Sequence, residues 1–232
     1  FLGDSPANAN EEESRYPIPG QPGNTPTPGT RDSVPEIATI YRSERAVTRS
    51  FLPISKFQNV TTQDLKNPPP EDWTYWRRGP KSQGYSPLNS INKENVSSLS
   101  LAWVWGMEPG RSQPAPLVRN GIIYIPNFGN IIQAIDGREG TLLWEYERQF
   151  PEGSRQGGQL RTIAMWEDMI YVATTDAHLV ALNARTGAVK WDVEIADETL
   201  GYSNTSGPIV ADGKVINGIN GCTRFFEESC FI

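Results

Sequence analysis

Two cysteines and a single histidine, Cys222, Cys230 and His178, are the residues of this sequence best suited to transition-metal binding or redox chemistry. A structural zinc site usually takes four Cys or His ligands, and a c-type haem needs a Cys-x-x-Cys-His motif, so the sequence excludes both. The cysteines leave two interpretations open. They form a disulfide in an oxidising compartment, or they are two free, buried thiols.

Three aspartates and the histidine lie in stretches that indicate turns. Asp136, Asp176 and Asp212 are flanked by expected strands, and Asp or Asn in such places bonds its own backbone. We therefore expect turn roles for all three. His178 is expected in an exposed turn between strands, and no residue of the sequence is predicted to be catalytic.

Composition narrows the class of protein. The 232 residues carry a formal net charge of −6 without a basic patch, which argues against a nucleic-acid partner. No apolar run approaches the roughly 18 residues of a membrane span. The length allows one large all-β domain or two ordinary domains.

A repeated phrase is the strongest structural signal. Residues 134–144 read AIDGREGTLLW and residues 181–191 read ALNARTGAVKW, so Trp144 and Trp191 stand 47 residues apart. A period in this range is typical of stacked supersecondary units. The aspartate or asparagine with its glycine suits a tight turn, and the tryptophan is large enough to reach the next unit.

Three expected hairpins follow the same period. Each has a strand, a two-residue turn and a second strand. The turns are Asn120-Gly121, Glu167-Asp168 and Asp212-Gly213. With the strands around each tryptophan, these hairpins form four-stranded antiparallel meanders. Leu101–Trp105 alternates and is aromatic, so we expect a further strand there.

Such small sheets bury both faces by packing radially, which predicts an all-β fold, a β-propeller. A β-sandwich with coincidental spacing is the alternative. Residues 1–70 are predicted to form a Pro-rich extended arm, within which only Ile37–Leu52 is apolar enough to pack. Residues 71–232 then supply the first blades. Because Ile232 falls inside the third unit, we expect a fragment or a cleaved piece.

The sequence also resembles a known family. Its opening segment is similar to that of the pyrroloquinoline quinone (PQQ) dependent alcohol dehydrogenases, and the tryptophan phrases resemble that family's blade-docking motif. The matching stretches are Asp72-Trp73, Gly84–Asn92, Asn95-Val96, Leu99 and Ala102-Trp103. The resemblance covers residues 72–232 and leaves out the arm.

The resemblance implies an eight-bladed quinoprotein propeller, of which this chain supplies about three blades. It implies PQQ and a cation on the axis, usually Ca²⁺ and sometimes a lanthanide, and a periplasmic location. Its partners would be an alcohol substrate, a cytochrome or other electron acceptor, and the remainder of the same propeller. A non-enzymatic propeller scaffold of the outer-membrane assembly type is the alternative; the opening segment and Arg161 favour the enzyme.

Four cofactor-binding residues are implied residue by residue. Gln113 stands where the family often has a glutamate at the cofactor edge. Arg161, with Thr162 beside it, matches the arginine that holds a PQQ carboxylate, for which a guanidinium is well shaped. Thr205 lies in a stretch similar to Y-T-I-T-G-A-P and would hydrogen-bond the cofactor.

The last implied residues surround Cys222. Gly221 and Cys222 lie in a stretch similar to G-N-G-G-A-E, where backbone approaches the cofactor. Thr223 replaces the glutamate that is a metal ligand in the family. Because hard cations prefer carboxylate oxygens, no metal ligand is assigned. A Cys222–Cys230 disulfide would fix this loop, and the family's catalytic base would lie after Ile232.

Overall fold

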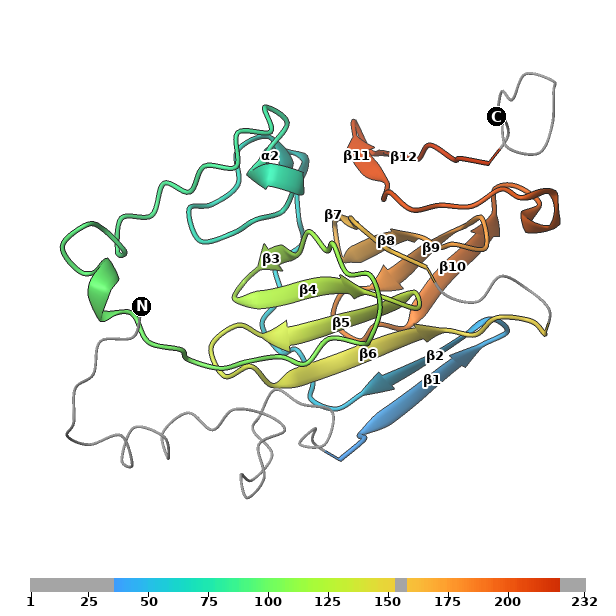
Figure 1. Ribbon diagram of the computed structural model, residues 1–232, viewed down its shortest axis with the longest axis horizontal. Coiled ribbons are helices and arrows are strands. Elements are labelled where there is room, and N and C mark those ends of the chain that lie inside the picture. Colours follow the sequence, from blue (N-terminus) through green and yellow to red (C-terminus); the bar gives the residue numbers. More distant parts are fainter. Residues whose placement is uncertain (1–35, 153–157, 222–232) are drawn as a thin grey trace.

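The computed structural model describes residues 36–152 and 158–221, and these residues fold into antiparallel sheets stacked side by side (Figure 1). The first sheet contains a meander of four strands, and the second sheet repeats it. The third sheet is a two-stranded hairpin. The strands are β3 (Leu117–Arg119), β4 (Ile122–Asn127), β5 (Ile131–Asp136) and β6 (Leu142–Arg148), then β7 (Ala164–Trp166), β8 (Met169–Ala173), β9 (His178–Asn183) and β10 (Val189–Glu194), then β11 (Ile209–Ala211) and β12 (Lys214–Ile216). The predicted all-β propeller architecture is confirmed.

Helical structure is sparse and short among the described residues. It consists of α2 (Thr62–Lys66) and three single-turn 3-10 segments at Trp76–Arg78, Val96–Ser98 and Glu198–Leu200. No described helix has the length and apolar character needed to cross a bilayer.

The hairpin turns form where the sequence predicts them. Asn120 and Gly121 have φ of 51° and 77°, and Asp212 and Gly213 have φ of 49° and 68°. Two consecutive residues in the left-handed region give the type I′ turn, whose twist matches that of the flanking strands. Glu167, with φ of 54°, takes the first place in the remaining turn.

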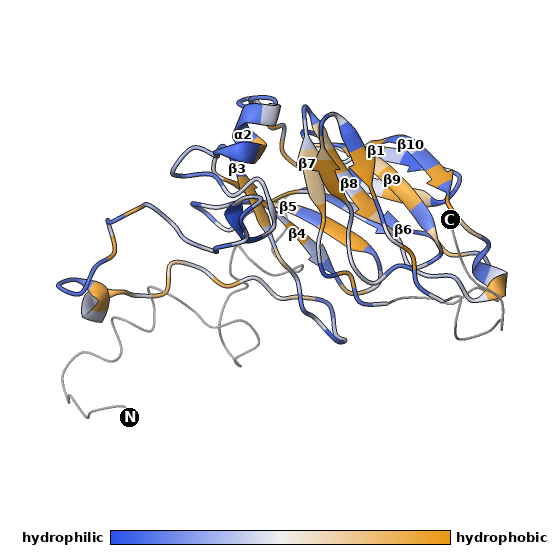
Figure 2. Ribbon diagram, turned by 90° about the horizontal axis from the view of Figure 1, so that it is seen from above, coloured by the Kyte–Doolittle hydropathy of each residue, from blue (hydrophilic) through white to orange (hydrophobic). Residues whose placement is uncertain are grey.

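Trp144 joins the first blade to the second, as its phrase predicts. Its Nε1 donates to the carbonyl oxygen of Ala184 at 3.0 Å, and the hydroxyl of Tyr124 donates to the same oxygen at 3.1 Å. Both aromatic side chains are fully buried. Apolar residues of both blades belong to one buried cluster around this contact, and Figure 2 shows hydrophobic colour along the strands of both blades.

The apolar part of the predicted arm forms a hairpin of its own. β1 (Thr39–Ser43) pairs with β2 (Ala46–Ser50), and β2 pairs with β6, which extends the first sheet to six strands (Figure 1). Thr48 on β2 also donates to the carbonyl oxygen of Gly187 in the second blade at 2.9 Å. Residues 1–35 lie outside the described residues, so the predicted boundary at residue 70 stays a prediction.

The expected strand at Leu101–Trp105 is not formed. Among the described residues no strand pairs with its backbone, so the alternating aromatic pattern reflects packing rather than pairing. Trp103 donates through Nε1 to the carbonyl oxygen of Gly137 at 3.1 Å and covers Gly140. Trp103 thus contacts the turn of the first blade as Trp144 contacts the turn of the second: each indole donates to a turn carbonyl and covers the glycine that follows.

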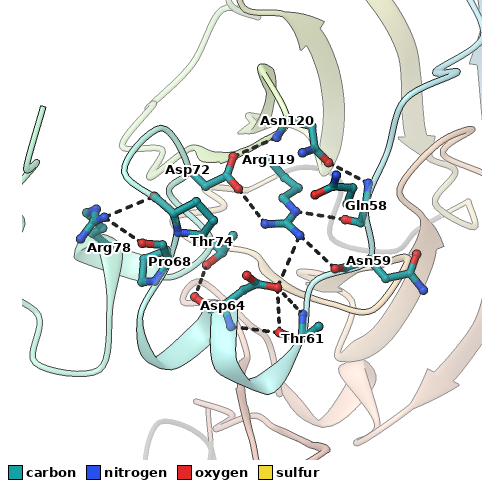
Figure 3. Close-up of polar contacts among 11 residues, drawn as sticks. Gln58, Asn59, Thr61, Asp64, Pro68, Asp72, Thr74, Arg78, Arg119 and Asn120 are labelled. Atoms are coloured by element: carbon teal, nitrogen blue, oxygen red, sulfur yellow. Dashed lines mark hydrogen bonds and ion pairs between the residues drawn. The ribbon is translucent and has the colours of Figure 1, made fainter. Parts of the chain in front are cut away.

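A buried ionic network fixes the segment before the first blade (Figure 3). Arg119, at the end of β3, donates to Asp72 Oδ2 at 2.7 Å and to the backbone carbonyls of Gln58 and Asn59 at 3.0 Å each. The other oxygen of Asp72 accepts from the backbone N–H of Asn120 at 2.9 Å. This network anchors the chain around α2 against the β3–β4 turn.

Candidate functional site

The loops that lead into the first strand of each blade converge on Arg161. Its Nε donates to Gln113 Oε1 at 3.2 Å, and its Nη1 donates to the carbonyl oxygen of Thr205 at 3.3 Å. Gln113 precedes β3, Arg161 precedes β7 and Thr205 precedes β11. Because each unit repeats the same path, three positions far apart in sequence arrive at one end of the stacked sheets. The structure therefore brings together three of the predicted site residues.

The backbone ties the first two loops together directly. The backbone N–H of Ala115 donates to the carbonyl oxygen of Arg161 at 2.7 Å, and Ala115 forms a parallel bridge with Thr162. This pairing sets the distance between Gln113 and Arg161 independently of their side chains.

The acceptors around Arg161 are all uncharged. Besides Gln113 and Thr205, Gln159 Oε1 accepts from Arg161 Nη2 at 3.1 Å. Within the described parts of the chain, no carboxylate forms an ion pair with this half-buried guanidinium. Because its acceptors among the described residues are neutral, this guanidinium is suited to bind an oxyanion such as a carboxylate.

Thr162 holds two loops together. Its hydroxyl accepts from the backbone N–H of Gly207 at 2.8 Å. A β-carbon on Gly207 would lie 1.9 Å from the carbonyl oxygen of Thr162, so only glycine fits there. The hydroxyl that the resemblance offers to a ligand thus already accepts one hydrogen bond, and it retains its own proton to donate.

Gly221 lies near the loop that carries Thr205, but not beside Thr205 itself. Ser203 and Asn220 exchange backbone hydrogen bonds at 2.9 and 3.2 Å, and this antiparallel pairing places residue 221 beside Tyr202. Gly221 has φ of 127°, and a β-carbon there would lie 2.2 Å from the carbonyl oxygen of Gly201. Cys222, Thr223 and Cys230 lie outside the described residues, so the disulfide and the role of Cys222 stay predictions.

A cavity of about 560 Å³ adjoins this cluster. Gln113, Arg161 and Thr162 supply polar groups to its wall, while Leu65 and Met165 are among its apolar lining residues. This volume lies in the range of small-molecule sites, roughly 300–1,000 Å³, which combine apolar walls with a few convergent polar groups. The arrangement places one cationic group beside apolar walls, which is what a site for an organic anion requires.

The prediction for His178 is wrong. His178 begins β9 and is buried, and its Nδ1 lies 2.7 Å from Asp192 Oδ1. Arg148 of the first blade ion-pairs with the same aspartate. A histidine next to a turn is exposed only when no neighbouring blade covers it. Here the first blade covers His178.

Asp176 lies in a turn as predicted, but its carboxylate has a second role. Its Oδ2 accepts from Arg148 Nη2 at 2.7 Å and from Nε at 3.0 Å, and both side chains are fully buried. Asp176 and Arg148 are 28 residues apart and belong to different blades. The residues next to Asp176 in the sequence predict its turn but cannot predict a partner in another blade.

Burial raises the pKa of Asp192, but the hydrogen bonds from His178 and Arg148 outweigh it and leave the pKa below its ordinary value. Burial raises the pKa of Glu198, and the nearby Asp176 charge adds to this. This cluster links the two blades and lies apart from the polar group around Arg161.

The described residues contain no group of three or more His, Cys, Asp or Glu side chains placed to bind a metal. The ligands of any cation are therefore not assigned from this part of the chain.

The stacked, repeated four-stranded sheets define the class of the protein, a β-propeller. Residues 73–224 match the family described as glucose/ethanol/alcohol dehydrogenase, beta-propeller domain. The match covers more than half of the chain, so the chain belongs to the PQQ-dependent alcohol dehydrogenase family. The resemblance stated from the sequence is confirmed.

Individual relatives agree with this assignment. Quinoprotein alcohol dehydrogenase PedH of Pseudomonas putida is 36% identical over 164 residues, which are 68% of this chain and 27% of that protein. The dehydrogenase subunit of the quinone alcohol dehydrogenase of Gluconobacter oxydans is 32% identical over 212 residues, or 87% of this chain and 28% of that protein. The chain thus spans less than a third of the length of these relatives.

Solved structures are similar to the same part of the chain. The quinohemoprotein alcohol dehydrogenase ADHIIG of Pseudomonas putida superposes with a TM-score of 0.63 at 30% identity, over 72% of this chain and 26% of that one. A europium-containing methanol dehydrogenase gives a TM-score of 0.58 at 27% identity, over 68% of this chain and 29% of that one.

Proposed function

We propose that this chain forms the first blades of an eight-bladed, PQQ-dependent dehydrogenase that oxidises an alcohol or a related hydroxyl compound. The observation that carries the proposal is the position of Arg161, which three neutral acceptors hold at the convergence of three blade loops. PQQ is a flat tricarboxylate, so it needs a cation and hydrogen-bond donors at its edge and apolar walls around it. The described site offers each of these.

The chain's own residues would hold and orient the ligand. Arg161 would bind a carboxylate through its guanidinium, while Gln113 and the Thr205 carbonyl keep that side chain in one orientation. The Thr162 hydroxyl has a proton to donate, and the Thr205 hydroxyl receives a weak contact from Asn220 Nδ2 at 3.5 Å. PQQ, when bound, supplies an electrophilic quinone that accepts a hydride from the substrate carbon.

A cation completes the proposed site. The family implies one beside PQQ, and we propose Ca²⁺ or a lanthanide, because either would polarise the reactive carbonyl of the quinone. Thr223 stands where the resemblance expects a carboxylate, so the ligands would come from other positions. One similar solved structure is titled as a europium-containing methanol dehydrogenase.

The remaining parts of the proposal concern the whole enzyme. We place it in the periplasm, with an alcohol as substrate and a cytochrome or another acceptor taking its electrons. Two relatives are named quinohemoprotein alcohol dehydrogenases, which supports electron transfer to haem. The scaffold alternative is not favoured, because the curated relatives cited above are named dehydrogenases.

The test is reconstitution of the complete gene product in its cofactor-free form. Adding PQQ with Ca²⁺ or a lanthanide should produce dye reduction with at least one member of an alcohol panel. Arg161→Ala should weaken PQQ binding about tenfold or more, since hydrogen bonds to charged groups contribute roughly 1.5–3 kcal/mol each. Arg138→Ala, in an exposed turn, is the matched control and should leave binding unchanged. Failure of the wild-type protein to bind PQQ and to reduce dye would reject the proposal.

A further inference from the structure

Gln159, which contacts Arg161 at the edge of the site, has an unused hydrogen-bond donor. Its Oε1 accepts from Arg161, whereas its Nε2 is buried and has no partner among the described residues. The orientation of the carboxamide follows from Arg161, which can only donate, so the oxygen must face the guanidinium and the nitrogen must face away from it. A buried donor without an acceptor is uncommon in folded proteins and calls for an explanation.

The backbone on the N-terminal side of Gln159 is held in place. The carbonyl oxygen of Gly158 accepts from the backbone N–H of Gly129 at 3.3 Å. A β-carbon on Gly158 would lie 2.5 Å from the Thr175 methyl group, so this turn packs tightly against the second blade. On the other side, Leu160 is buried. The carboxamide is therefore presented from a fixed backbone, as preorganised ligand contacts are.

We propose that Gln159 donates its free Nε2 proton to an oxygen of the same anionic ligand that Arg161 binds. The pair then acts as a unit in which the guanidinium supplies charge and the carboxamide supplies a second, neutral donor. The ligand class is a flat molecule with several carboxylate or carbonyl oxygens at its edge. This inference rests on the proposed function, and within it Gln159 is a cofactor-contacting residue.

The competing role for Gln159 is only to hold Arg161 in position. In that role only Oε1 matters, and a variant that keeps an acceptor beside Arg161 should bind the ligand normally. Gln159→Glu separates the two roles, because glutamate has the same length and offers an acceptor to Arg161 but removes the donor. Gln159→Met has a similar length and removes both groups.

The experiment measures the affinity of the cofactor-free complete gene product for PQQ, by quenching of tryptophan fluorescence. At pH 8 we expect Gln159→Glu and Gln159→Met each to bind about tenfold to a hundredfold more weakly than wild type, as for loss of a hydrogen bond to a charged group. Gln149→Glu is the matched control, since Gln149 is exposed, and it should change affinity less than twofold.

A pH series distinguishes donation from positioning. As pH falls from 8 toward the ordinary glutamate pKa of about 4.3, an increasing fraction of the glutamate of Gln159→Glu is protonated, and its carboxylic acid regains a donor. Its affinity should therefore move toward that of wild type measured at the same pH, whereas the deficit of Gln159→Met should stay constant. Thermal unfolding of each cofactor-free variant shows whether it is folded.

The outcomes separate the two proposals. Wild-type affinity in Gln159→Glu at every pH, with normal PQQ binding by the wild-type protein, would overturn this inference and leave the proposed function standing. Absence of PQQ binding by the wild-type protein would overturn both.

Discussion

The indole of Trp144 covers Gly187 of the following blade so closely that a β-carbon on the glycine would lie 2.5 Å from the ring. Gly187 also adopts a φ of 70° at the end of its turn. Close packing and positive φ thus require glycine at one position, and the interface between the two blades depends on it.

We expect Gly187→Ala to destabilise the protein much more than Gly121→Ala. Gly121 has a similar φ of 77°, but nothing lies within 4 Å of a β-carbon there. The left-handed backbone costs each variant about 1–2 kcal/mol, and displacement of the indole adds roughly 1–3 kcal/mol at Gly187 only. Urea unfolding of both variants measures the difference. Equal free energies of unfolding would show that the blades adapt without cost.

Trp144 and Tyr124 donate to the same Ala184 carbonyl, so we expect their contributions to be coupled. Tyr124→Phe leaves the indole as donor and should cost about 1 kcal/mol. Trp144→Phe leaves the tyrosine hydroxyl as donor and should cost about 2–4 kcal/mol, mainly from lost packing. The double variant leaves a buried carbonyl unpaired. Its loss of stability should exceed the sum of the single losses by about 1 kcal/mol. Strictly additive losses would contradict the idea that the two side chains share the Ala184 carbonyl as acceptor.

Arg148 neutralises two carboxylates between the blades. Arg148→Met should cost about 3–5 kcal/mol because it leaves the buried Asp176 with only the longer ion pair to Arg45, at 3.6 Å. Adding Asp176→Asn removes that buried charge and should restore part of the loss. Lys214→Met is the control: the Lys214–Asp212 pair is 74% and 98% exposed on its two sides, and such pairs contribute about 0–1 kcal/mol. A double variant less stable than Arg148→Met would argue against the ionic account.

Stability should fall in acid as Asp192 becomes protonated. Its pKa in the folded state lies below the ordinary value of 3.8, so its stabilising effect is fully present above that value and is lost as the pH falls through the folded pKa. Asp192→Asn should therefore flatten the decline in the free energy of unfolding below pH 3.8. Asp212→Asn, at an exposed turn, should leave the slope as in wild type. An unchanged slope in Asp192→Asn would refute this assignment.

The sequence predicted the features that depend on local chemistry or on the period. The turn at Asn120-Gly121 follows from two residues that tolerate positive φ, and the contact of Trp144 with the next blade follows from its place in a repeating unit. Gln113, Arg161 and Thr205 converge for the same reason, because equivalent positions of successive blades lie at the same end. Their role in cofactor binding stays a prediction.

Features that depend on distant partners were not predictable. Leu101–Trp105 has the alternation of a strand, but a strand also requires a neighbouring backbone. The buried pair of Arg119 and Asp72 joins residues 47 positions apart, and neither belongs to a repeated phrase. The unused donor of Gln159 was not predictable either, because such a donor becomes visible only when every neighbouring acceptor has been placed.

The hairpin of β1 and β2 also changes which backbone edge the first blade presents. Without it, the seven residues of β6, which include Leu142, Leu143 and Trp144, would offer unpaired N–H and C=O groups along an apolar strand. Such an edge is a template for aggregation. β1 takes its place with five residues, most of them exposed and one of them Arg42. The hairpin therefore protects the chain against edge-to-edge association, and β10 of the second blade lacks this cover among the described residues.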